Sequence, residues 1–316
     1  MGSKSRIAEW IVELLPPANN FVDLFAGGCS ITHAALLSKK WKNFIINDLS
    51  DIPSLFIDAI NGKYKNETRW ISREDFFKYK DTDPYIRLCW SFGNCQRTYL
   101  YGEDIEDYKR SLHEAIYEYK YERALKYGID FSKIDDIKGV HNRRFAVRKV
   151  IKDGSHYFFK DKPWKSVERL QSSEQLERLQ SLERIQTLQS QQNLSRLNEL
   201  CNLDCNLNYI KVFQKSYENV EIPKGSIVYC DIPYKGTGTY ITNDENGFDY
   251  DKFYKWANNI KHPVFISEYE MPKEFALISK REIRTTLSPT SNSTKTVECL
   301  YANTIGEKLF KKQQLF

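Results

Sequence analysis

The order of short segments near the N-terminus limits the fold of this 316-residue chain more than any other feature. An apolar run at 21–25 leads into a glycine turn at 26–30, and an apolar-periodic stretch follows at 31–38. A second apolar run at 44–46 ends just before Asp48. This order is typical of the beginning of a doubly wound α/β sheet, in which a strand, a glycine turn, a helix and a second strand are followed by an acidic residue. We therefore expect an α/β fold.

The glycine turn and the acid that follows it suit one class of ligand. Gly27 and Gly28 let the backbone approach a ligand closely, and the start of the next helix offers free N–H groups. Asp48 lies about twenty residues further on, where a carboxylate can accept both hydroxyls of a ribose. Taken alone, the glycine pair could be only a turn, and Asp48 only a helix cap. Together they favour an adenosine-containing ligand.

The C-terminal third predicts further parts of the sheet. Elements are expected as strands at 209–213, 226–230, 263–267, 280–287 and 296–301, and as a helix at 250–260.

A four-residue motif directly follows the predicted strand at 226–230, at the edge where open α/β sheets place their ligands. It consists of Asp231, Ile232, Pro233 and Tyr234. An exocyclic amine on a nucleobase is a poor nucleophile, because its lone pair is delocalised into the ring. The Asp231 carboxylate and the Ile232 carbonyl could accept hydrogen bonds from that amine and localise the lone pair, while Tyr234 stacks on the extruded base. Taken alone, the motif is more simply a turn that ends a strand and buries a tyrosine.

Six segments, taken in order, resemble the Dam-type (phage-like) DNA adenine-N6 methyltransferases. They are Gly2-Ser3-Lys4, residues 23–29, Asp48, residues 91–102, the motif at 231–234 and residues 265–272. The resemblance implies a Rossmann-like, S-adenosylmethionine-dependent core with a smaller, mainly helical DNA-recognition lobe, and it leaves outside it the Leu-rich repeat that we interpret as an insertion. We expect core segments at 1–69 and 208–316, the lobe at 70–167 and the insertion at 168–207.

The resemblance also implies roles for individual residues. The expected cofactor-binding residues are Lys4, Asp23, Phe25, Gly27, Gly28, Asp48 and Asp231, and the expected catalytic residues are those at 231–234. The implied reaction is direct in-line transfer of methyl from S-adenosylmethionine to N6 of adenine, without a metal or a covalent enzyme intermediate. Two residues depart from the family pattern. Ile232 replaces the first proline of the motif, and Cys29 adds a side chain near the cofactor where the family often has glycine.

The expected lobe contains a strongly basic stretch at 138–152. The expected DNA contacts come from Arg97, Tyr99, Arg143, Arg144 and Arg148. Arginine can neutralise phosphates, and aromatic rings can stack on bases. A charge run alone is usually a solvated face, but beside a methyltransferase core double-stranded DNA is the better interpretation. A restriction endonuclease or a phage or host DNA-replication context would suit such an enzyme.

Residues 168–207 repeat Leu-Gln-Ser and Leu-Glu-Arg units. Their apolar residues recur at every third position, which winds the apolar stripe around a helix and disfavours a coiled coil. We interpret the stretch as an expanded surface insertion, with a small solenoid or partner-binding rod as the alternative.

The composition limits the partners, the metal sites and the cellular location that we expect for the protein. The net charge of +5 permits an anionic partner without demanding one. The seven scattered cysteines predict free thiols in a reducing cytoplasm, and the family resemblance implies that of a bacterial or phage-infected cell. Cys201 and Cys205 have no second Cys or His pair near them, so no zinc site is expected. No apolar run approaches the roughly 20 residues that span a bilayer, and the N-terminus does not resemble a targeting peptide.

Two alternatives to adenine methylation remain open. Methylation of a cytosine amine or a glutamine side chain is disfavoured, since such enzymes usually carry Ser or Asn in place of Asp231. A non-catalytic DNA-binding or scaffold protein on a decayed methyltransferase fold is kept open by Ile232 and the repeat. The intact Lys4, Asp48, Asp231 and Tyr234 argue against it.

Overall fold

The computed structural model describes residues 4–64, 66–92, 95–158, 209–234, 247–285 and 294–315. They divide into two compact units. The described residues up to Lys63 and from Tyr209 onward form one unit, here called the sheet unit, and those from Tyr64 to Phe158 form the helical unit. The repeat expected at 168–207 lies outside the described residues, as do Cys201 and Cys205.

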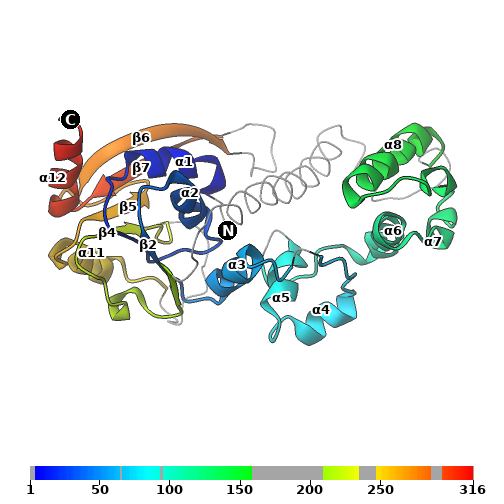
Figure 1. Cartoon of the computed structure of the whole chain (residues 1–316), viewed down its shortest axis with the longest axis horizontal. Helices are drawn as coiled ribbons and strands as arrows, with labels where there is room; N and C mark the ends of the chain where they lie inside the picture. Colours follow the sequence, from blue (N-terminus) through cyan, green and yellow to red (C-terminus); the bar gives the residue numbers. More distant parts are fainter. Residues whose placement is uncertain are drawn as a thin grey trace. The chain divides into compact units, whose positions relative to one another are not determined.

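The sheet unit is built on a seven-stranded sheet with the order β3-β2-β1-β4-β5-β7-β6 (Figure 1). The strands are β1 (Asn20–Asp23), β2 (Asn43–Asn47), β3 (Ile210–Phe213), β4 (Ser226–Cys230), β5 (Val264–Glu268), β6 (Ala276–Thr285) and β7 (Thr294–Ala302). The pairings among β1 to β5 are parallel, while β7 is antiparallel to both β5 and β6. All five residues of β4 and of β5 are buried, as is usual for central strands covered on both faces.

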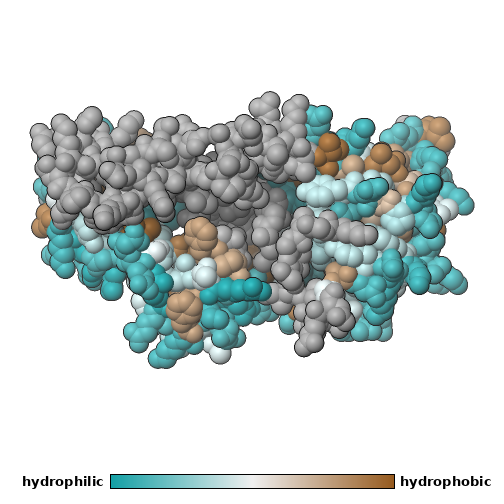
Figure 2. All heavy atoms as spheres, turned by 180° about the vertical axis from the view of Figure 1, so that it is seen from behind, coloured by the Kyte–Doolittle hydropathy of each residue, from teal (hydrophilic) through white to brown (hydrophobic). Residues whose placement is uncertain are grey.

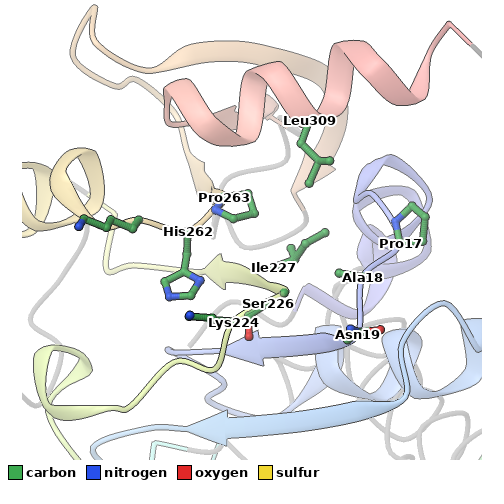
Figure 3. Close-up of a pocket in the computed structure, with 11 residues that line it drawn as sticks. Pro17, Ala18, Asn19, Lys224, Ser226, Ile227, His262, Pro263 and Leu309 are labelled. Atoms are coloured by element: carbon green, nitrogen blue, oxygen red, sulfur yellow. The ribbon is translucent and has the colours of Figure 1, made fainter.

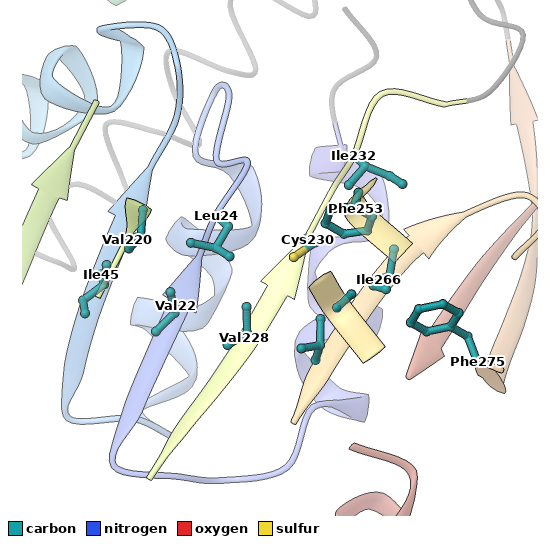
Figure 4. Packing of buried hydrophobic residues seen from close by; sticks show 12 residues of the cluster. Val22, Leu24, Ile45, Val220, Val228, Cys230, Ile232, Phe253, Ile266 and Phe275 are labelled. Atoms are coloured by element: carbon teal, nitrogen blue, oxygen red, sulfur yellow. The ribbon is translucent and has the colours of Figure 1, made fainter. Parts of the chain in front are cut away.

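The helices of this unit cover both faces of the sheet (Figure 1). They are η1 (Lys4–Arg6), α1 (Ala8–Leu14), α2 (Ser30–Ser38), α3 (Ile52–Ile60), η6 (Tyr217–Asn219), α11 (Tyr250–Asn259) and α12 (Thr304–Gln313). Alternate residues of β1 point to opposite faces. Val22 and Leu24 pack in one core with Phe253 of α11 (Figure 4). Asp23 points to the other face, where it accepts a hydrogen bond from Thr32 of α2.

The centre of the sheet is a topological switch point. β1 pairs with β2 on one side and with β4 on the other, so the strand order reverses between β1 and β4. Asp23 lies opposite Tyr229 in the register, so the chain leaves both strands at the same edge. Open α/β sheets bind ligands in the crevice that forms there. The fold thus places the glycine turn beside the motif at 231–234.

The helical unit consists of short helices joined by tight turns. They are α4 (Arg73–Tyr79), α5 (Pro84–Cys89), α6 (Glu103–His113), the π-helical turn η3 (Glu114–Glu118), α7 (Glu122–Leu125), η4 (Ser132–Ile134) and α8 (Val140–Phe158). Local sequence explains two of the starts. Ser72 accepts a hydrogen bond from the Asp75 N–H at the beginning of α4, and Asp83 caps α5, which starts with Pro84.

The strands and helices that the sequence predicts in the sheet unit are found within a few residues of their expected bounds. The helices α3 and α12 were not expected. In the part of the chain that the structure describes, no helix is long and apolar enough to cross a membrane.

Candidate active site

The motif at 231–234 begins directly after β4, on the edge of the sheet defined by the switch point. The Ile232 side chain is buried in the core, where it belongs to the same cluster as Cys230 and Phe253 (Figure 4). Asp231 remains 24% exposed. The motif therefore turns its second side chain into the core and leaves its carboxylate at the crevice.

Lys4 joins the start of the chain to this motif. Its Nζ lies 3.5 Å from Asp231 Oδ1 and donates hydrogen bonds to Tyr234 Oη and Glu298 Oε1. Tyr234 also donates to Glu298 Oε1. Glu298 lies on β7 and is 2% exposed. The Lys4 ammonium group thus contacts two carboxylates and a phenol, which come from the motif at 231–234 and from β7.

This cluster shifts the acidity of its members. Burial opposes the charge on Lys4, but the carboxylates of Asp231 and Glu298 outweigh it and raise the Lys4 pKa. The protein around Asp231 removes most of its water, and this burial raises the Asp231 pKa to about 7 although Lys4 opposes it. A carboxylate with such a pKa can hold or release a proton near neutral pH.

The glycine turn is closed by the predicted acid. The Gly27 N–H donates to Asp48 Oδ2 at 2.8 Å, and Asp48 Oδ1 accepts from the N–H and Oγ of Ser50. Gly27 has a φ of 47°, in the left-handed region that favours glycine. A Cβ built on Gly27 or Gly28 would meet no atom within 4 Å, so the turn borders open space. The structure thus brings Asp48 and the glycine turn together.

Asp23 is a buried acid beneath this turn. Thr32 donates a 2.6 Å hydrogen bond to Asp23 Oδ2, while Oδ1 has no hydrogen-bond partner among the described residues. Burial raises the Asp23 pKa to about 7, against the effect of the Thr32 hydrogen bond. An unsatisfied buried oxygen at the crevice fits a ligand that brings its own donor.

Two further residues of the turn have apolar surroundings. The Phe25 ring lies 5.4–5.8 Å, between centroids, from the rings of Tyr217, Phe248 and Phe253. Cys29 is fully buried and packs with Ala26 and Ile46. The Cys29 side chain therefore points into the core, which differs from the expectation that it lines the cofactor pocket.

Two of the expected DNA contacts occupy the interior of the helical unit. Tyr99 is 4% exposed, and its hydroxyl donates to the Ile71 carbonyl at 2.6 Å. Arg143 is 1% exposed. Its five N–H bonds go to the carbonyls of Ala115, Ile116, Ile134 and Ile137 and to the Tyr121 hydroxyl. Neither side chain presents a polar group to solvent, so the prediction that Tyr99 and Arg143 contact DNA disagrees with the structure.

The remaining basic residues are more accessible. Arg97 and Arg148 are exposed, and Arg144 is partly buried and donates to the Tyr117 hydroxyl. Among the coloured atoms of the face seen in Figure 2, hydrophilic residues predominate and hydrophobic ones are scattered.

A separate groove of about 640 Å³ lies at the amino ends of the central strands (Figure 3). Asn19, Ser226 and Pro263 are among the residues that line it. Asp231 follows the opposite end of β4, so this groove is not part of the crevice described above.

Glu298 is the site residue that the sequence did not reveal. It is an isolated acid in an apolar stretch of β7, far in sequence from its partners. In the described part of the chain, no cluster of three or more His, Cys, Asp or Glu residues is suited to hold a metal ion.

Comparison with known proteins agrees with this geometry. A search of curated proteins found no match. The sequence model of the D12 class N6 adenine-specific DNA methyltransferases matches residues 1–304. The chain therefore belongs to this family of S-adenosylmethionine-dependent enzymes, which methylate N6 of adenine in DNA.

Proposed function

We propose that the sheet unit is a Rossmann-like methyltransferase core in which Asp231 receives a flipped adenine, and that the helical unit reads the DNA. One observation carries the proposal. The register of β1 with β4 sets the glycine turn beside Asp231 at the switch point of the sheet. Cofactor and base sites must adjoin in this way for a direct methyl transfer.

The residues around the glycine turn fit S-adenosylmethionine. Open space borders Gly27 and Gly28, and the Asp48 carboxylate stands where it can exchange its Gly27 hydrogen bond for ribose hydroxyls. The orphaned Asp23 Oδ1 can accept a further donor. Phe25 supplies an apolar wall. When bound, S-adenosylmethionine supplies an electrophilic methyl group.

The motif at 231–234 acts on the base. Asp231 Oδ and the Ile232 carbonyl accept the two N–H bonds of N6, which directs the nitrogen lone pair away from the ring. After transfer, N6 carries one proton too many, and the Asp231 carboxylate takes it. Ile232 in place of proline keeps the carbonyl acceptor, and its side chain is accommodated in the core. Tyr234 supplies the surface on which the adenine stacks.

The helical unit would hold the duplex. Arg97, Arg144 and Arg148 are the residues that we propose for phosphate contacts, since Arg143 and Tyr99 are committed to the interior. Phosphate contacts position a protein on DNA without reading sequence.

The biological setting that we propose is the cytoplasm, where the enzyme would act with a restriction endonuclease or in phage or host DNA replication. Sequencing methylated adenines in expressing cells tests this setting and reports the target site.

Transfer of labelled methyl from S-adenosylmethionine to duplex DNA tests the reaction. Wild type should label adenine-containing duplexes. Asp231→Asn, which keeps the shape but loses the charge, should lower kcat by about 10³-fold or more. Its circular dichroism spectrum and DNA affinity should stay unchanged. Wild-type protein that binds DNA but labels no adenine would favour the non-catalytic scaffold instead.

A further inference from the structure

Glu298 occupies the wall of the site although it belongs to an antiparallel strand. β7 runs against β5, with Cys299 opposite Glu268 at the end of β5. Glu298, one residue earlier on β7, therefore lies at the same edge as the loop that follows β4. Because β7 is antiparallel to its neighbours, the Glu298 carboxylate lies at the carboxyl ends of the parallel strands.

Stability alone does not explain a carboxylate in this position. Glu298 is 2% exposed, and burial of a charge costs several kcal/mol before its partners compensate. Apolar residues of similar volume usually serve a core as well as a buried ion pair does. The contacts of Glu298 point instead to the reaction, because Lys4 and Tyr234 both donate to its Oε1.

The orientation of Tyr234 depends on these contacts. Its hydroxyl is held by Glu298 and Lys4, and its ring meets the Tyr269 ring edge-on at 4.5 Å between centroids. Tyr234 is 8% exposed, so an adenine can stack on it only after a neighbouring group moves. A ring that is anchored at its hydroxyl keeps its plane during that movement.

We infer that Glu298 is a positioning residue for methyl transfer: it fixes the Tyr234 ring on which the adenine stacks and holds Lys4 beside Asp231. The inference rests on the proposed function of Tyr234. Glu298 touches neither the cofactor nor the base in this role. It acts through the Tyr234 hydroxyl and the Lys4 ammonium.

Paired variants test this role in the methyl-transfer assay. Glu298→Leu and Tyr234→Phe should each lower kcat by about 10- to 100-fold at saturating cofactor, since small displacements of a reacting group have effects of this size. Glu298→Gln restores the acceptor for Tyr234 and should recover most of the rate. The double variant Glu298→Leu/Tyr234→Phe should be no slower than the slower single variant, because both break one contact. Glu307→Gln on α12 is the matched control outside the site.

A spectroscopic readout separates this inference from the proposed reaction. With 3-fluorotyrosine at position 234, wild type and Glu298→Gln should give the same single ¹⁹F line, and Glu298→Leu a shifted or divided one. This holds even if no methyl is transferred, a result that would remove the proposed function alone. Unchanged ¹⁹F spectra, wild-type kcat in Glu298→Leu, or multiplicative effects in the double variant would each overturn the positioning role. If Glu298→Leu does not fold, Tyr234→Phe probes the same contact from its other end, and a wild-type kcat in that variant overturns the role.

Discussion

Both units bury charged groups, but the hydrogen bonds of those groups differ. In the sheet unit, Asp23 has one oxygen that no described residue hydrogen-bonds, and Asp23 and Asp231 both have a pKa raised to about 7. In the helical unit, Arg143 is at least as deeply buried, yet every one of its N–H groups is donated to a carbonyl or a hydroxyl.

The difference separates a site from a structural support. Arg143 donates to carbonyls of η3 and η4, at the ends of these short helical turns. It therefore has no capacity left for a ligand. Asp23 and Asp231 of the sheet unit have perturbed pKa values, which are a usual feature of functional sites. Positive charge alone therefore does not identify a DNA contact in the helical unit.

Removal of the Arg143 guanidinium should give the largest loss of stability. Arg143→Met keeps the length of the side chain but removes five hydrogen bonds to backbone carbonyls and to the Tyr121 hydroxyl, which should lower the free energy of unfolding by about 3–5 kcal/mol. Urea-induced unfolding followed by circular dichroism measures this. Arg148→Met, on the exposed side of the same helix, is the matched control and should change it by less than about 0.5 kcal/mol. Equal losses in the two variants would contradict the structural role of Arg143.

Removal of the Asp23 charge should increase stability, in contrast to Arg143, because burial in the fold disfavours the ionised carboxylate. Its folded-state pKa of about 7 lies above that of an unfolded aspartate, so its contribution to stability is complete only at acidic pH and is lost as the pH rises through 7. Asp23→Asn cannot ionise and can still accept from Thr32. Relative to wild type, it should gain on the order of 2 kcal/mol between pH 5 and pH 8. A difference between variants that does not change with pH would show that the Asp23 carboxyl is already ionised in the folded state at pH 5, so that its pKa is not raised.

The sheet unit was the easier part to predict, because its signals are local. The apolar runs of β1, β2 and β4 identify the strands, and their carboxyl ends necessarily meet at one edge in a parallel sheet. This topology is enough to bring Asp48 and Asp231 to the glycine turn. Glu298 could not be found in this way, since its place depends on the antiparallel pairing of β7 with β5.

The helical unit shows where charge misleads. The charge of the basic stretch at 138–152 predicts a solvent-exposed surface. Helical periodicity nevertheless places Arg143 on the same side as Ala146 and Val147, which are buried. That spacing was available in the sequence and could have identified Arg143 as an inward-facing residue. Its hydrogen bonds could not have been foreseen, because they depend on the π-helical turn and the left-handed Tyr119 that end α6.

The acidity of Asp231 allows a more moderate test of the sheet unit. In the proposed reaction the ionised Asp231 carboxylate is required, so kcat should fall as the pH decreases below about 7, by tenfold per unit at the lower end. The Lys4 ammonium lowers the Asp231 pKa, so Lys4→Met should move the midpoint upward by about one unit at saturating cofactor. A midpoint that stays in place would mean that Lys4 does not set the charge of Asp231.

The smallest expected effect belongs to Arg148, the exposed counterpart of Arg143 on α8. If Arg148 contacts a phosphate, Arg148→Met should weaken DNA binding only several-fold and reduce the slope of log affinity against log salt by about 1. The loss should be the same for every duplex sequence, because a phosphate contact carries no base information. Lys308→Met, which removes one exposed charge from α12, controls for net charge and should leave the slope unchanged. If both variants change the slope equally, the positive charge of the whole chain, and not the exposed side of α8, determines the affinity. If Arg148→Met alone changes the slope, the two arginines of α8 have different roles: Arg143 stabilises the fold and Arg148 binds DNA.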